Sequence, residues 1–105
     1  MRMRRPAKVK DIMKVASVAV KAGQLLYSDH ANERLRERMI VKPEVEAILT
    51  NGHHEARKDQ FSERHAAWDY AVRGKTVDGR SLRIIVALID PKMLIVTAID
   101  LDKKE

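Results

Sequence analysis

The stretch Leu82-Arg83-Ile84-Ile85-Val86-Ala87-Leu88-Ile89 is apolar at every position except Arg83. A continuous apolar run of this length, bounded by turn residues, is typical of a central β-strand. The turns are visible on both sides, because Asp78-Gly79 precedes the run and Asp90-Pro91-Lys92 follows it. The sequence therefore predicts a strand that is joined to its neighbours by short connections.

Strands are predicted on either side of this central strand. Met93 to Ile99 is apolar apart from Thr97, and we expect it to form the last strand. His65 to Arg73 alternates, with Trp68, Tyr70 and Val72 on one face and Arg73 on the other, as a half-buried strand does. A weaker strand is predicted over His53 to Lys58. The C-terminal half thus favours an antiparallel meander of about four strands.

The N-terminal half has helical spacing instead. A first helix is predicted over Val9 to Ala22 and ends at Gly23. Ser28 and Asp29 offer N-cap side chains for a second helix that stops near Met39. A third helix carries Pro43 in its first turn and is followed by Gly52.

Helices followed by strands indicate the α+β class, with two to three helices packed on one antiparallel sheet. We expect one domain over residues 1–105, with a loose basic arm at 1–8 and a frayed, charged tail at 100–105. No internal repeat or linker interrupts this order.

Charge is distributed unevenly along the chain. Of the 105 residues 45% are hydrophobic and 34% charged, which indicates a folded domain, and the formal net charge is +6. Residues 1–38 carry ten Lys or Arg against four acidic residues, so the remainder is nearly neutral. This asymmetry predicts a polyanionic partner, a nucleic acid before a membrane, with an acidic protein as the alternative.

The lack of cysteine excludes disulfides and thiolate chemistry and fits a cytoplasmic protein. No apolar run is long enough to span a membrane. Adjacent His53 and His54 suggest a metal site, but neighbouring residues on a strand point to opposite faces. We therefore expect no metal and no cofactor, and we interpret the two histidines as surface residues.

His30, Arg34 and Arg38 form the main candidate site. Their spacing of four places them along one face of the second helix. An imidazole that titrates near pH ~6.5 and two guanidiniums that grip phosphate by paired hydrogen bonds suit chemistry on a phosphodiester. The alternative is a solvated helix face, because Glu33 and Glu37 alternate with the cations.

Further candidates lie outside this row. Arg73 is a fourth candidate catalytic residue, expected at a strand end that opens on the same cleft, or else an ordinary surface cation. Five residues are candidates for RNA binding: Arg36, His65, Thr97, Lys8 and Lys10. His65 is alternatively a surface residue, Thr97 a cross-strand partner and the arm lysines idle.

Short motifs in a fixed order extend this interpretation. They are Tyr27-Ser28-Asp29-His30-Ala31, Arg34, Arg38, Met39-Ile40, Glu44-Val45-Glu46, Arg73-Gly74, Gly79, Leu82 to Val86 and Ile95-Val96-Thr97. Over residues 23–99 the chain resembles a bacterial domain family of unknown function that is placed among the RelE-like toxins. The resemblance implies a RelE/barnase-like toxin fold.

A weaker similarity connects the chain to the MqsR-type mRNA interferases. It rests on Ala22-Gly23-Gln24, on Ser62 with His65 and Trp68, and on Leu94-Ile95-Val96. Trp68 is followed by Asp69 where that family has a glutamine, and the family's late Tyr and Lys fall near Leu82 and Ile99. The catalytic set of that family is therefore not transferred.

The resemblance implies a toxin-like endoribonuclease, with RNA and a cognate antitoxin as partners. The chemistry that the resemblance implies is metal-free cleavage of RNA, by attack of the 2′-hydroxyl on the neighbouring phosphate. His30 would act as base or acid, and Arg34, Arg38 and Arg73 would stabilise the phosphate. Two alternatives stay open: a non-catalytic RNA-binding or protein-interaction module, and a regulatory protein whose sheet docks a partner.

Overall fold

The computed structural model describes residues 5–103 and has an α+β architecture. Its helices are α1 Ile12–Lys21, α2 Asp29–Glu37 and α3 Lys42–Asn51, with a short 3₁₀ helix η1 at Ala56–Lys58. Its strands are β1 Leu25–Tyr27, β2 His53–His54, β3 Gln60–Ser62, β4 Ala67–Lys75, β5 Ser81–Ile89 and β6 Lys92–Asp100. The expected α+β class is thus confirmed.

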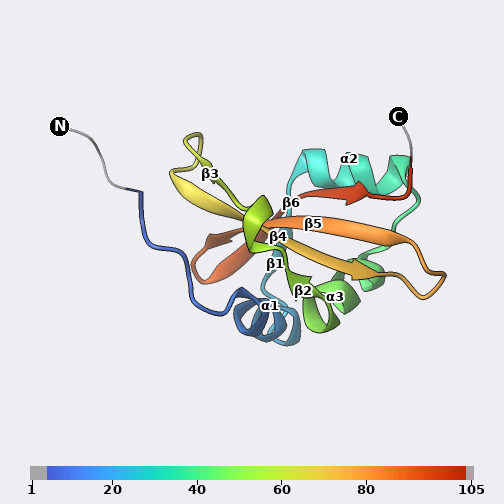
Figure 1. Ribbon diagram of the computed structural model, residues 1–105, viewed down its shortest axis with the longest axis horizontal. Coiled ribbons are helices and arrows are strands. Elements are labelled where there is room, and N and C mark those ends of the chain that lie inside the picture. Colours follow the sequence, from blue (N-terminus) through green and yellow to red (C-terminus); the bar gives the residue numbers. More distant parts are fainter. Residues whose placement is uncertain (1–4, 104–105) are drawn as a thin grey trace.

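The six strands form one mostly antiparallel sheet in the order β1-β6-β5-β4-β2, with β3 pairing on β4 beside β2 (Figure 1). β1 pairs with β6 in parallel, and the other pairs are antiparallel. β5 pairs along its length with both β4 and β6. The apolar run that predicted a central strand does occupy the middle of the sheet.

The sheet has one covered face and one open face. Leu82, Ile84 and Val86 of β5 are fully buried and belong to a core that all three helices share. Arg83 and Ile85, which alternate with them, remain partly exposed. We call the side that carries Asp69, Arg73, Arg83, Ile85 and Ile99 the open face. The antiparallel alternation therefore leaves one side of the sheet accessible for a partner.

Capping residues in the sequence determine where the helices begin. Ser28 Oγ accepts a hydrogen bond of 2.9 Å from the backbone N–H of Ala31 at the start of α2. The Glu44 carboxylate does the same for Val41 N–H at 3.0 Å, before α3. α1 begins at Ile12 rather than Val9, because Asp11 caps it through Lys14 N–H. α2 ends before Met39, whose φ of 54° lies outside the helical region.

The sheet has more strands than the expected four. β1 and β3 have three residues each, which is too short for a periodic pattern to show in the sequence. The weak strand predicted at His53 to Lys58 is wrong beyond His54, because η1 follows. β4 begins at Ala67, after a β3–β4 turn that contains His65.

The expectation of a frayed tail is wrong for residues 100–102. The backbone N–H of Leu101 donates to Ser81 O at 2.9 Å, and Asp102 accepts a 2.7 Å hydrogen bond from Ser81 N–H. Asp100 in turn accepts from Asp102 N–H. Residues 104–105 lie outside the described part of the chain.

The basic arm is also not loose where it is described, from residue 5 onward. Trp68 Nε1 donates a 2.7 Å hydrogen bond to Pro6 O, and Lys8 Nζ lies 4.8 Å from the Trp68 ring centroid. Lys8 also pairs at 3.0 Å with the fully buried carboxylate of Asp59. A hydrogen bond, a cation–π contact and an ion pair together hold the arm beside the β3–β4 hairpin. Residues 1–4 lie outside the described range.

Candidate nucleic-acid interface

A groove of about 400 Å³ runs over the open face. Side chains from η1 and from four strands line it: Lys58, Gln60, Asp69, Arg83, Ile85, Val96, Thr97 and Ile99. Two of them are cations and one is an acid, and the aliphatic side chains come from the middle of the sheet. This mixture of an apolar floor with a few polar groups is typical of ligand-binding grooves.

The strand register explains why these side chains face the same way. Arg83 of β5 is paired with Arg73 on β4 and with Ile99 on β6, and directly opposed residues share a face. The pairing shifts between Ile85 and Val86, which leaves Val96 as an extra residue on β6. Such a bulge turns neighbouring side chains to the same side, so Val96 and Thr97 both line the groove.

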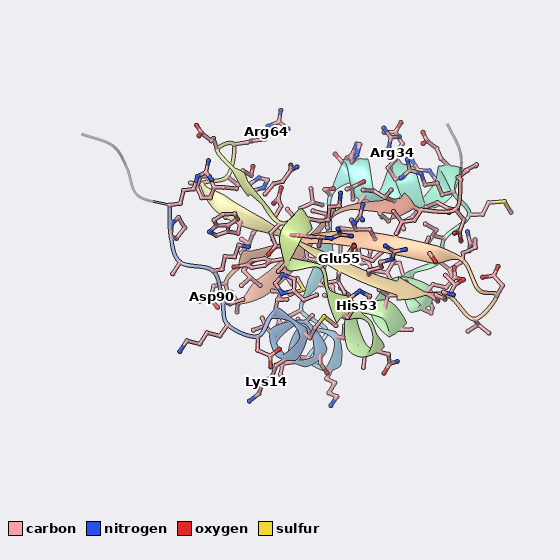
Figure 2. All side chains as sticks on the ribbon, viewed as in Figure 1. Lys14, Arg34, His53, Glu55, Arg64 and Asp90 are labelled. Carbon is pink, nitrogen blue, oxygen red and sulfur yellow. The ribbon has the colours of Figure 1, made fainter. Side chains whose placement is uncertain are left out.

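Glu55 holds two of the arginines on this face. Arg83 donates to its carboxylate from Nε at 2.7 Å and from Nη2 at 3.3 Å, and Arg73 Nη1 lies 3.5 Å away. Figure 2 shows Glu55 near the middle of the sheet in this view. The hydrogen bond from Arg83 is the main reason that the pKa of Glu55 is lowered, against the effect of its burial. Glu55, Arg73 and Arg83 together carry one net positive charge.

His65 and Asp69 form a second polar pair at the groove. His65 Nε2 lies 3.0 Å from Asp69 Oδ1, and the two side chains are 29% and 20% exposed. Asp69 is the groove-lining acid, and Gln60 is its cross-strand neighbour on β3. This contact restrains the rotation of the Asp69 carboxylate.

The row on α2 borders the same face along the edge of β6. Arg38 Nη1 donates a hydrogen bond to the carbonyl oxygen of Ala98. Ala98 lies between Thr97 and Ile99, which both line the groove. Arg34 is paired with Glu37 at 2.8 Å, and His30 is exposed. Figure 2 shows Arg34 on α2, beyond β6.

The predicted site residues are thus brought together only in part. Thr97 lines the groove and His65 contacts the groove residue Asp69, whereas Arg73 lies on β4, two strands from β6. Two strand spacings correspond to about 10 Å, so Arg73 and the α2 row flank the groove rather than meeting in one pocket. Arg36 is exposed on α2.

Lys8 and Lys10, the two candidate lysines of the basic arm, lie away from the groove. Lys8 is engaged by Asp59 and Trp68, and Trp68 packs against the core on the covered side. Lys10 is exposed just before α1. Neither lysine lines the groove, so the structure does not place them beside the other candidates.

Sequence reasoning missed Glu55, Lys58, Arg83 and Arg80. For Arg83 a signal was present, because it is the one charged residue in the apolar run of the central strand. Glu55 lies in a segment without clear periodicity, and only the fold brings it to Arg83.

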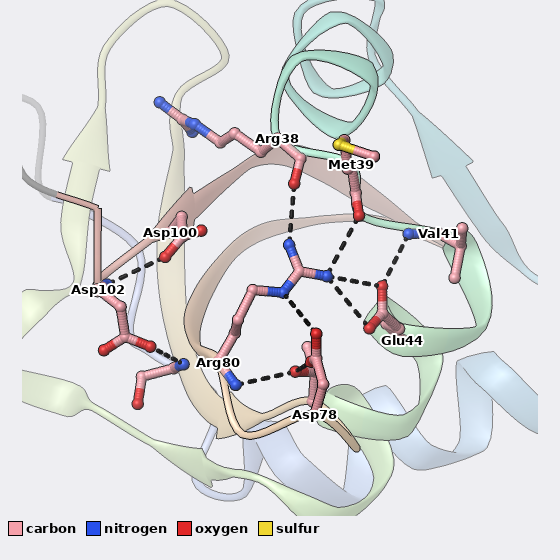
Figure 3. A network of polar contacts seen from close by, with 10 residues as sticks. Arg38, Met39, Val41, Glu44, Asp78, Arg80, Asp100 and Asp102 are labelled. Carbon is pink, nitrogen blue, oxygen red and sulfur yellow. Dashed lines mark hydrogen bonds and ion pairs between the residues drawn. The ribbon is translucent and has the colours of Figure 1, made fainter.

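Arg80 connects three segments at the far end of the sheet (Figure 3). It donates to Arg38 O at 2.9 Å and to Met39 O at 3.2 Å, which are carbonyls at the C-terminal end of α2. It also contacts Glu44 at 3.3 Å and Asp78 at 3.4 Å. Arg80 therefore fixes the end of α2 and, with it, the backbone of the candidate residue Arg38.

Within residues 5–103, no group of three or more His, Asp or Glu side chains is placed to hold a metal ion. His54 binds Asp59 through Nε2 at 2.8 Å, whereas His53 is exposed. In the same range no helix is long and apolar enough to cross a membrane.

Comparison with known proteins gives one family. A family model described as "Domain of unknown function (DUF4258)" matches residues 27–100. The matched segment contains α2 and the strands β2 to β6, and hence both the row on α2 and the groove. No curated protein and no solved structure gave a significant match.

Proposed function

The chain belongs to the family described as a domain of unknown function (DUF4258), and we propose that it binds single-stranded RNA on the open face of its sheet and cleaves it. The RNA backbone crosses the edge of β6 between the row on α2 and the groove. The exposed bases of a single strand enter the groove, as is usual where proteins read RNA sequence. A double helix would not present its bases in this way.

One observation carries the proposal, namely the hydrogen bond from Arg38 to the carbonyl of Ala98. This contact brings the basic row of α2 to the strand that supplies Val96, Thr97 and Ile99 to the groove. Arg83 and Lys58 add positive charge from the sheet and from η1. In such an arrangement the cations on either side bind the phosphates, and the apolar surface between them binds the bases.

The cleavage step that we propose uses the exposed imidazole of His30. His30 takes the proton from the ribose 2′-hydroxyl as its oxygen attacks the adjacent phosphorus. The P–O5′ bond breaks, and the 5′-oxygen leaves with a proton supplied by a second acid or by water. Arg34, one turn along α2 from His30, stabilises the extra charge on the phosphoryl oxygens, and Arg73 binds a neighbouring phosphate on the other side of the groove. The products are a 2′,3′-cyclic phosphate and a 5′-hydroxyl.

His65 is less suited than His30 to accept this proton. Its Nε2 is already engaged by Asp69, whereas His30 makes no hydrogen bond to another side chain within residues 5–103. The base must be able to approach the 2′-hydroxyl to hydrogen-bond distance. His30, at the exposed start of α2, meets this requirement.

The wider biological setting of the proposal comes from the motifs that resemble RelE-like toxins and, more distantly, MqsR-type mRNA interferases. We extend it to a toxin of a toxin–antitoxin pair that acts on mRNA in the cytoplasm and is held inactive by its antitoxin. Growth arrest on induced expression, relieved by His30→Ala, tests this extension.

A non-catalytic RNA-binding module is the second candidate. It is favoured by the engagement of the guanidiniums, since Arg34 contacts Glu37, Arg38 contacts Ala98, and Arg73 contacts Glu55. Cations held in this way can position a phosphate backbone without taking part in chemistry. In this case the same surface binds RNA and releases it intact.

Mapping of RNA ends distinguishes the two candidates. The purified parent protein is incubated with single-stranded RNA, and the products are analysed for cyclic phosphate ends. We expect cleavage by the parent, its loss in His30→Ala and its retention in Lys14→Ala, a control variant at an exposed side chain of α1.

Each other result has a definite meaning. Full cleavage by His30→Ala removes His30 from the mechanism. Binding without cleavage by the parent selects the non-catalytic module. Absence of both binding and cleavage contradicts both candidates.

A further inference from the structure

We infer that the groove selects a guanine base, and that Asp69 reads its Watson–Crick edge. The inference rests on the proposed binding of RNA to the open face and adds the class of nucleotide that this site takes. It follows from the position of one carboxylate in a groove whose other charged lining residues are cations.

Asp69 is the only acidic residue among those that line the groove within the described part of the chain. Its Oδ1 is engaged by His65 at 3.0 Å, and its side chain is 20% exposed. Among residues 5–103, Oδ2 accepts no hydrogen bond. An ionised carboxylate has about four acceptor positions, so Asp69 retains capacity for donors from a ligand.

A carboxylate in an RNA-binding groove is unfavourable unless the ligand supplies donors. Phosphates repel it, which excludes the backbone from this position. Bases differ in what they present on the Watson–Crick edge. Guanine offers two adjacent donors, N1–H and the 2-amino group, which match the two oxygens of one carboxylate.

The other three bases fit less well. Adenine and cytosine each place a ring-nitrogen acceptor beside their amino group, and uracil has a single N–H between two carbonyl oxygens. Each of them would bring a lone pair against the carboxylate. Repulsive contacts of this kind discriminate as strongly as attractive ones.

Neighbouring residues complete the complementarity to guanine. Lys58 and Gln60 line the groove with Asp69 and carry donors for the O6 and N7 acceptors of a guanine ring. Ile85, Val96 and Ile99 offer an apolar surface to its flat face. A groove of about 400 Å³ has room for one base together with part of its ribose.

His65 serves as a positioning residue in this arrangement. His65 lies in the turn between β3 and β4, and its contact with Oδ1 restrains the rotation of the Asp69 carboxylate on β4. A fixed acceptor plane is needed for two parallel hydrogen bonds. His65→Ala should therefore reduce base discrimination while leaving the phosphate contacts unaltered.

The test measures the affinity of short RNAs that differ at one base. Oligouridines with a single central guanine, inosine, adenine or cytosine are titrated with the full chain, and fluorescence anisotropy is recorded. Methylated 2′-hydroxyls prevent cleavage. We expect guanine to bind at least about tenfold more tightly than adenine, with inosine in between because it lacks the 2-amino group.

Variants assign the preference to the carboxylate. Asp69→Asn should bring the guanine-to-adenine ratio close to one, and Glu63→Gln, an exposed carboxylate in the same hairpin, should leave it unchanged. His65→Ala provides a second reading if Asp69→Asn does not fold. Each variant is compared by its melting temperature before titration.

Two results overturn the inference. Equal affinity of the parent for all four RNAs shows that the groove does not select a base, while RNA binding itself stands. A guanine preference that survives both Asp69→Asn and His65→Ala shows that other residues read the base. If no RNA binds, the proposed function fails together with the inference.

Discussion

Arg83 donates a hydrogen bond of 2.7 Å from Nε to Oε1 of Glu55, and this contact joins the central strand to the segment after β2. Glu55 is 8% exposed. A buried carboxylate with a forked partner stabilises the fold only while it is ionised, and losing one partner leaves the other buried without compensation.

Glu55→Gln should lower the free energy of unfolding by about 1–3 kcal/mol at pH 7, because a charge-assisted pair becomes a neutral contact. Chemical denaturation of parent and variant measures this difference. Glu63→Gln, in the exposed β3–β4 turn, serves as the control and should change stability by less than about 0.5 kcal/mol.

The same pair predicts a dependence on pH. The pKa of Glu55 is lowered in the folded protein, so its contribution is fully present above the ordinary glutamate value and is lost as pH falls through the folded-state pKa. The difference between parent and Glu55→Gln should therefore shrink below about pH 4. A difference that stays constant down to pH 2 would contradict this account.

Arg80→Ala should destabilise the protein by about 2–4 kcal/mol. Arg80 satisfies the carbonyls of Arg38 and Met39 and pairs with Glu44, so its removal leaves several polar groups without a partner at once (Figure 3). Thermal denaturation checks the effect. Arg64→Ala, an exposed arginine in the β3–β4 turn, should be nearly neutral, and equal melting temperatures for the two variants would disprove the role of Arg80.

Gly52→Ala should destabilise the fold by about 3 kcal/mol or more. A Cβ at this position would lie 2.6 Å from Ile48 O and would also collide with the backbone oxygen of Arg73. The conflict is one of space, since φ at Gly52 is −76°. Gly23→Ala is the matched control: φ is +67° with nothing within 4 Å, so only the backbone penalty of about 1–2 kcal/mol applies.

Tyr27 should ionise at unusually high pH. Burial, reinforced by the charge of Glu46, raises the pKa of Tyr27 from 10.0 to about 12. Stability from the neutral phenol is complete below pH 10 and declines as pH rises through about 12. An absorbance titration near 295 nm should show a component near pH 12 that Tyr27→Phe removes; an unchanged titration curve would refute it.

Much of the fold could be predicted from local patterns. Some features depend only on residues nearby in the sequence and can therefore be recognised there. They are the apolar run of β5, the N-cap at Ser28 and the helix-terminating Gly23. β1 has only three residues and depends on a parallel pairing with β6 across more than sixty positions. Such pairing has no local signal, which is why β1 was not anticipated.

The site was predictable only in part for the same reason. The spacing of His30, Arg34 and Arg38 shows that they share a helix face, but not which strand that face borders. The contact of Arg38 with Ala98, and that of Arg83 with Glu55, are set by the register of the sheet. The specific relation to RelE-like toxins rests on motif order and stays a proposal.

Amide chemical shifts of the ¹⁵N-labelled chain, recorded during titration with a guanine-containing single-stranded RNA, test the central claim most directly. We predict that the changes gather on β4, β5, β6 and α2, with Asp69, Thr97 and Arg34 among them, and that α1 stays unaffected. Changes confined to α1 and α3, or none at saturating RNA, would contradict the assignment of the open face as an RNA-binding surface.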